Sequence, residues 1–252
     1  MRMGGAGSGQ LRPTSQLAGF PWVSHIVVGR CLMPDERFRP SGRSAAPRAL
    51  ESPVTAVPSH AVATARSSRA RVPLEEPKSL LGRAMSFYSK RKYGQVLDNG
   101  LALLHNRRVM IADVRFELSV ARWNKLDPQL KALAVMATAT QIECSWCLDF
   151  GYYEAHSNGL DTGKIAAVSN WRSSDAFTAV ERRVLEYAEA MTATPPQVTD
   201  ELAEALRTDL GNDGLVELTM MVGVENLRSR FNSALGLASQ GFAESCRVPG
   251  HS

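Results

Sequence analysis

Two cysteines, Cys144 and Cys147, stand three residues apart in QIECSWCLDFGYYEAHSNGLD, residues 141–161. Three interpretations fit such a pair: a redox-active dithiol, half of a metal site, or two small apolar residues that fill a core. Residues at this spacing in a helix have Cβ atoms about 5–6 Å apart, and a small adjustment reaches the distance of about 3.5–4.5 Å in a disulfide. A nearby helix N-terminus would favour the thiolate, which is the nucleophile. The spacing therefore favours a dithiol.

The other two interpretations depend on the rest of the chain. A structural zinc site needs a full set of cysteine and histidine ligands. The remaining cysteines, Cys31 and Cys246, lie near the ends of the chain, and no second ligand pair is formed by His25, His60, His105, His156 or His251. We therefore expect no metal. The core-filling interpretation stays open, because free cysteine is often buried and packs as a small hydrophobe.

Helix signals recur from residue 85 onwards, whereas strand signals do not. Asp127 followed by Pro128 is typical of a helix start. Thr178 and Glu181 match a capping box, and Thr199, followed by acidic residues, predicts another helix start. Further helices are expected over Arg108–Trp123 and from about Asp213 to about Leu237, where the mostly apolar sequence predicts burial in the bundle or in an oligomer.

The cysteine stretch itself reads as one continuous helix that Gly159 ends. Together these signals predict an all-α domain, a compact bundle of about six to eight helices.

Composition divides the chain in two. Residues 1–84 hold 12 Lys and Arg against 5 Asp and Glu, together with 9 of the 13 prolines. We expect this segment to be a disordered leader, a targeting segment or the product of a misplaced start, and residues 244–252 to be a flexible tail. The basic charge thus belongs to the leader, so we expect no nucleic-acid partner. No apolar run is long enough to cross a membrane.

Three sequence features occur together in residues 85–243, between the leader and the tail. They are Cys144-Ser-Trp-Cys147 followed by Leu-Asp-Phe-Gly, a helix stop at Asn158-Gly159-Leu160, and the stretch ENLRSRFN from Glu225 to Asn232. With these features, residues 85–243 resemble the carboxymuconolactone decarboxylase and alkylhydroperoxidase D-like superfamily, in particular a branch with the CSWC pair. The resemblance implies an all-helical homo-oligomer and, for members with both cysteines, thiol-dependent reduction of hydroperoxides.

The resemblance also exposes a difference in the proton relay. In the family's peroxidases a glutamate lies 12 residues before the first cysteine and a histidine four after the second, positions held here by Ala132 and Gly151. In the family that histidine allows a proton to be drawn from the second cysteine. The thiols therefore match, while both relay partners are absent.

Another residue would have to replace the relay. Glu143, which directly precedes Cys144, is our candidate, although its charge would also disfavour the thiolate. In a continuous helix His156 points to the side opposite Cys147. We expect Asp149 and Glu154 to be solvated and Trp146 to pack in the core or an interface. A neighbouring helix could instead supply the group, from Glu217, Glu225 or Arg228.

The leading hypothesis is a thiol peroxidase or related oxidoreductase. One thiolate would attack a hydroperoxide to give a sulfenic acid, the other cysteine would form the Cys144–Cys147 disulfide, and an external dithiol reductant would reopen it. By the resemblance, Cys147 is the attacking residue. We expect no cofactor, because no glycine-rich dinucleotide turn occurs, and a cytoplasmic location, where dithiols are kept reduced.

Two other functions remain open. A non-redox lactone decarboxylase would need general acid–base residues, for which His105 and His156 are the candidates. A non-catalytic helical oligomer could bind a ligand or sense redox state through the same dithiol.

Overall fold

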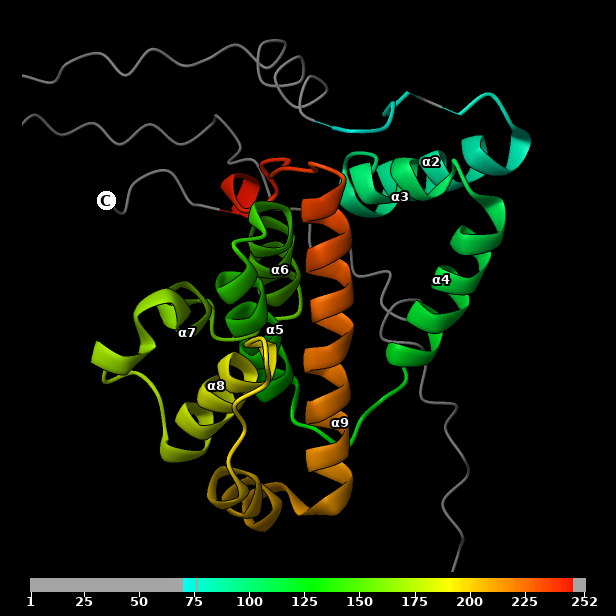
Figure 1. The fold of residues 1–252 in the computed structure, drawn as a ribbon. Coiled ribbons are helices and arrows are strands. Elements are labelled where there is room, and N and C mark those ends of the chain that lie inside the picture. Colours follow the sequence, from blue (N-terminus) through cyan, green and yellow to red (C-terminus); the bar gives the residue numbers. More distant parts are fainter. Residues whose placement is uncertain (1–69, 76, 247–252) are drawn as a thin grey trace, which may run out of the picture.

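The computed structural model describes residues 70–75 and 77–246, and this part of the chain is all-α (Figure 1). These residues contain no strand, which confirms the expected fold class. None of their helices is long and apolar enough to cross a membrane. The helices are α2 (Leu80–Tyr93), α3 (Asp98–Leu103), α4 (Arg107–Val120), α5 (Pro128–Ile142), α6 (Ser145–Ser157), α7 (Thr162–Ala167), α8 (Ala179–Thr192) and α9 (Asp200–Ala234), with 3-10 turns η1 (Val168–Ser173) and η2 (Glu244–Cys246).

Helix α5 forms the centre of the bundle, with α6, α8 and α9 packed around it (Figure 1). Its apolar face is buried, and Leu133 and Ala134 are 0% exposed. Burying such side chains stabilises the fold by about 25 cal/mol for each Å² of apolar surface. The face packs against buried residues of its neighbours, namely Ala155 of α6, Val184 and Leu185 of α8, and Leu218 and Val222 of α9.

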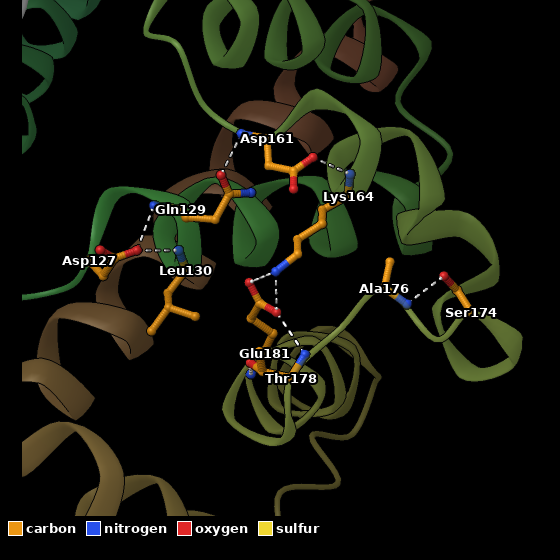
Figure 2. Close-up of polar contacts among 9 residues, drawn as sticks. All are labelled: Asp127, Gln129, Leu130, Asp161, Lys164, Ser174, Ala176, Thr178 and Glu181. Carbon is orange, nitrogen blue, oxygen red and sulfur yellow. Dashed lines mark hydrogen bonds and ion pairs between the residues drawn. The ribbon is translucent and has the colours of Figure 1, made fainter.

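The predicted helix starts are present. Asp127 Oδ1 accepts hydrogen bonds from two backbone N–H groups in the first turn of α5, at 2.8 and 3.2 Å. Thr178 and Glu181 form the capping box of α8. Figure 2 shows that the Glu181 carboxylate also binds Lys164 of α7, with both oxygens 2.8 Å from Nζ. One glutamate therefore both caps α8 and ties α7 to it.

Helix α9 joins two segments that the sequence predicted as separate helices. The first begins at the expected cap, where Thr199 Oγ1 accepts the N–H of Leu202 at 3.2 Å. At Gly211 the backbone has φ 72° and ψ 174°, a conformation that only glycine adopts without strain. The chain then turns into the second segment, which runs to Ala234 beside α5 and α6 (Figure 1).

The N-terminal boundary differs from the prediction. Helix α2 begins ahead of Met85, at Leu80, because Ser79 Oγ accepts the N–H of Gly82 at 3.1 Å and caps it. Upstream, the N–H of Arg71 donates to the carbonyl of Leu235 at 2.8 Å, so this part of the proposed leader packs on the domain. The rest of the leader, residues 1–69 and 76, lies outside the described residues, as do residues 247–252 of the proposed tail.

Candidate active site

The two cysteines lie at a break between α5 and α6. Glu143 takes a left-handed conformation, with φ 59° and ψ 36°, and its N–H caps α5 on the carbonyls of Ala139 and Thr140. Cys144 follows in an extended conformation, with φ −78° and ψ 93°, as the N-cap of α6. The predicted continuous helix is therefore wrong. No glycine or proline marks the break, because a glutamate takes the position that glycine usually holds.

Cys144 and Cys147 are joined by a disulfide, and their Cα atoms are 5.3 Å apart. The backbone N–H of Cys147 donates to Cys144 Sγ at 3.3 Å, so the sulfur acts as a helix cap. Both sulfurs thus lie at the positive end of the α6 dipole, which favours negative charge there. The residues are 1% and 5% exposed, within a small apolar cluster that includes Trp146 and Leu237.

The first turns of α6 are fixed to the C-terminal segment. Trp146 Nε1 donates to Gln240 Oε1 at 2.9 Å, and its ring stacks on Phe150 with centroids 5.0 Å apart, so the predicted packing role is confirmed. Asp149 is 8% exposed and accepts three backbone N–H groups of residues 240–243, at 2.7 to 2.8 Å. The expectation of a solvated Asp149 is wrong, since the carboxylate holds this segment.

Asn232 of α9 is the polar side chain in contact with the cysteine pair. Its Nδ2 donates a hydrogen bond to Cys147 Sγ at 3.3 Å, and the residue is 2% exposed. A disulfide or thiolate sulfur has only lone pairs to offer, so the amide presents its N–H. Sequence analysis gave Asn232 no role. No local signal could have identified it, because it stands 85 positions from Cys147 in the chain.

Three more polar residues continue from Asn232 along α9. Ser229 is 0% exposed, and its hydroxyl donates to Glu225 Oε1 at 2.7 Å. Glu225 is 2% exposed and lies 3.6 Å from the guanidinium of Arg228. Burial raises the pKa of Glu225 to about 6, while Arg228 and Ser229 act in the opposite direction. Their spacing places 225, 229 and 232 on one face of the helix.

Carboxylates from two other helices surround Arg228. Its Nε donates to Glu117 Oε1 of α4 at 2.8 Å, and a second guanidinium nitrogen binds the other oxygen. Burial raises the pKa of Glu154 of α6 to about 7, against the effects of Lys92 and Arg228. Burial also raises the pKa of Asp113, with Glu117 adding to the effect. Glu154 is thus partly buried rather than solvated. We call these four the carboxylate cluster: Asp113, Glu117, Glu154 and Glu225.

The other predicted site residues lie elsewhere. Glu143 adjoins Cys144 in the chain, but its side chain is exposed at the junction. His105 and His156 are also exposed. Glu217 is buried and forms an ion pair with Lys131 at 2.6 Å. Glu217, Glu225 and Arg228, the three groups considered as replacements for the relay, all lie on α9. Of these, Glu225 and Arg228 lie with the polar residues that lead to Cys147. Among the described residues, no three His, Cys, Asp or Glu side chains form a metal-binding group.

The two positions that would hold the relay residues, Ala132 and Gly151, are packed against neighbouring side chains. Ala132 is partly buried against the main core. Gly151 lies in the second turn of α6, where the thioether of Met136 approaches it from α5. The space that a histidine side chain would need is therefore filled.

Comparison with known proteins identifies the relatives of the chain. Residues 108–190 match the family model of the carboxymuconolactone decarboxylase family. The uncharacterized protein YnjA of Escherichia coli (strain K12) is 38% identical over 124 residues, which cover 49% of this chain and 66% of YnjA. The match thus spans slightly less than two thirds of that relative.

Solved structures show the same fold at low sequence identity. The alkylhydroperoxidase AhpD core of a peroxidase-related protein from Ralstonia eutropha JMP134 is 20% identical, with a TM-score of 0.56 over 72% of this chain and 98% of that one. The debrominase Bmp8, in complex with 2,3,4-tribromopyrrole, is 15% identical, with a TM-score of 0.61 over 70% and 94%.

Proposed function

Because residues 108–190 match the carboxymuconolactone decarboxylase family, we propose that this chain is a member of the carboxymuconolactone decarboxylase and alkylhydroperoxidase D-like superfamily and a thiol-dependent oxidoreductase that reduces hydroperoxides. The observation that carries the proposal is the Cys144–Cys147 disulfide at the N-terminus of α6, with a hydrogen-bond donor on each sulfur. A helix N-terminus and neutral donors both favour a thiolate once the disulfide is reduced. This arrangement suits a nucleophilic thiol with a resolving partner beside it.

The reaction would proceed in three balanced steps. The Cys147 thiolate attacks one oxygen of the hydroperoxide, so that an S–O bond forms, the O–O bond breaks and the alkoxide leaves as an alcohol after taking a proton. The Cys144 thiol then attacks the sulfenic sulfur, forming the disulfide and releasing water. An external dithiol reduces the disulfide by exchange and becomes oxidised itself. A reducing compartment such as the cytoplasm would maintain that dithiol.

Cys147 is the better candidate for the attacking sulfur. It has a side-chain donor, Asn232, in addition to its place near the helix N-terminus. It is also the more exposed of the two cysteines, at 5% against 1%. Cys144 is bound as the cap of α6, a position that suits the resolving role because its backbone is fixed opposite Cys147.

A redox sensor is the second candidate function. Its support is the packing at the relay positions, where Ala132 and Gly151 stand in place of titratable groups and Met136 fills the space beside Gly151. Such a protein would cycle between dithiol and disulfide without turning over peroxide rapidly. A lactone decarboxylase receives less support, because its candidate bases, His105 and His156, are both exposed.

The decisive experiment follows the full chain by intact mass after reduction and exposure to a small excess of organic hydroperoxide. Cys144→Ser and Cys147→Ser are run in parallel. We expect the parent to lose two hydrogens rapidly, and a sulfenic acid to be trapped only in Cys144→Ser. A rate no higher than that of a free cysteine peptide would exclude the peroxidase and leave the redox sensor.

We also propose that the protein assembles as a homo-oligomer through α2. The buried residues of this helix are small, namely Gly82, Ser86 and Ser89. Its large apolar residues face solvent, namely Leu80 (85% exposed), Leu81 (45%), Phe87 (69%) and Tyr88 (55%). An amphipathic helix with its apolar side outwards is typical of an interface.

A second copy offers a complementary surface for α2. A groove of about 580 Å³ beside α9 is lined by Trp123, Asn212, Asp213, Val216, Glu217 and Met220. Two of its apolar residues are well exposed, Val216 at 63% and Met220 at 45%. The first segment of α9 next to it is acidic, whereas α2 carries exposed Arg83 and Arg91. Apolar area and opposite charge therefore favour contact between the two surfaces.

A further inference from the structure

We propose that Asn232 is a catalytic residue whose amide holds the Cys147 thiolate, and that Glu225, acting through Ser229, takes up the thiol proton. This inference rests on the proposed thiol chemistry and supplies the groups that replace the missing relay. The proton balance is simple: Cys147 changes from thiol to thiolate, and the Glu225 carboxylate becomes a carboxylic acid. The proton later neutralises the alkoxide that leaves.

The contact between Asn232 and Cys147 carries the first half of the proposal. The amide is 2% exposed and its N–H lies 3.3 Å from the sulfur, so water does not compete for the bond. A hydrogen bond to a charged acceptor is stronger than one to a neutral acceptor. The same contact therefore stabilises the thiolate more than the thiol or the disulfide.

The order of residues along α9 carries the second half. Glu225, Ser229 and Asn232 follow one another at one-turn spacing on a single face, and the Ser229 hydroxyl already donates to the Glu225 carboxylate at 2.7 Å. Helical spacing therefore places Ser229 one turn from Glu225 on one side and one turn from Asn232 on the other. Hydroxyls can both donate and accept a proton, as a relay requires.

The surroundings make Glu225 a suitable acceptor near neutral pH. Its burial favours the protonated form, and the guanidinium of Arg228 limits this effect. Of the charged groups on neighbouring helices, Glu117 of α4 acts on Glu225 directly, and Asp113 of α4 and Glu154 of α6 act on its partner Arg228. Lys92 of α2 in turn acts on Glu154, and all four groups have to be kept constant in any test.

The test measures the alkylation rate of Cys147 against pH, which needs no peroxide. The full chain carries Cys144→Ser throughout, because serine is itself a good helix cap and leaves one thiol at the site. Iodoacetamide is the probe, and the alkylated Cys147 peptide is quantified by mass spectrometry. Hydroperoxide turnover is measured separately, so that failure of the proposed function is distinguished from failure of this inference.

Asn232→Ala should raise the pH midpoint of Cys147 alkylation by about one unit, and Asn232→Asp should raise it further because it places a like charge beside the sulfur. Asn226→Ala is the matched control. Asn226 lies on the same helix but donates to Thr192 Oγ1 at 3.0 Å, and should leave the midpoint unchanged. A midpoint that does not change in Asn232→Ala would overturn the role of Asn232.

Glu225→Gln tests the proton acceptor. The parent alkylation curve should contain a second inflection near pH 6, where Glu225 titrates. Glu225→Gln and Ser229→Ala should remove or weaken it, while Glu217→Gln, which changes a buried carboxylate paired with Lys131, should retain it. An inflection that persists unchanged in Glu225→Gln would exclude Glu225 as the acceptor.

Discussion

A Cβ atom built on Gly151 lies 2.6 Å from the sulfur of Met136, so these two residues compete for one space between α5 and α6. Met136 is only 6% exposed and has little room to move. Gly151 therefore belongs to the packing of the site. The histidine that the family resemblance implies for this position cannot be added without a compensating change.

The first prediction concerns stability at this contact. Gly151→Ala should lower the free energy of unfolding by about 1–2 kcal/mol, because overpacking exceeds the gain in helix propensity. Adding Met136→Ala should relieve the clash, which a double-mutant cycle in urea unfolding would detect. Gly100→Ala is the control, since its nearest neighbour, Leu97 Cβ, lies 3.9 Å away. Equal stability of Gly151→Ala and the parent would show that the space is free.

The second prediction is that the proton relay implied by the resemblance can be built into this chain. The triple variant Ala132→Glu, Met136→Ala and Gly151→His should raise the rate of hydroperoxide reduction about tenfold or more, because a positioned base assists proton transfer. The same variant with Ala132→Gln is the control and should show a smaller gain. Stopped-flow measurement of peroxide-dependent disulfide formation gives the rates. A faster Gln variant would contradict the relay explanation.

The third prediction concerns the pH dependence of stability. Burial raises the pKa of Glu154 to about 7 and that of Glu225 to about 6, above their usual value of 4.5. Between about pH 4.5 and pH 7 these two carboxyl groups therefore bind more protons in the native state than in the unfolded state. The free energy of unfolding decreases as pH rises through this range. Glu154→Gln should reduce this decrease by on the order of 2 kcal/mol. Urea unfolding at a series of pH values measures the free energy of unfolding of the parent and the variant. A parent whose free energy of unfolding does not change with pH would refute the prediction.

The fourth prediction concerns Asp149, whose carboxylate accepts three backbone N–H groups from residues 240–243. Asp149→Asn should destabilise the protein by about 2–3 kcal/mol, because the amide offers one acceptor oxygen and leaves buried donors unpaired. Trp146 is bound to Gln240, so its fluorescence should report the loosened segment. Asp175→Asn, at an exposed loop position, is the control. An unaltered fluorescence spectrum would argue against this coupling.

The fifth prediction concerns self-association through α2. Phe87→Glu should shift the mass measured by light scattering towards the monomer, since it places a charge in the proposed interface. Ala166→Glu, at an exposed position of α7, should leave the mass unchanged. High salt should also weaken assembly if charge contributes. A parent that is monomeric at all concentrations would remove the proposal.

The sequence by itself determined the features that depend on neighbours within one helical turn. Asp127 with Pro128, the Thr178–Glu181 box and Thr199 all start helices as predicted, because a cap needs only the next few backbone N–H groups. The spacing of Cys144 and Cys147 likewise predicted a pair that can form a disulfide. Local geometry was sufficient in each case.

The helix break at Glu143 could not be read from the sequence. A left-handed glutamate is uncommon, and it costs free energy that the packing of α5 and α6 has to supply. That break decides the site, since it turns Cys144 from a residue inside a helix into the cap of α6. The sequence predicted the pair but not its place at a helix N-terminus.

Only the tertiary structure decided which polar groups surround the thiols. Asn232 meets Cys147 across a long separation in the chain, and Arg228 reaches Glu117 from a different helix. Glu225 and Glu217 occupy the same helix with similar sequence signals, yet only Glu225 belongs to the polar face that leads to the sulfur. Contacts and burial of this kind depend on how helices pack against one another, and helical periodicity alone leaves that packing undetermined.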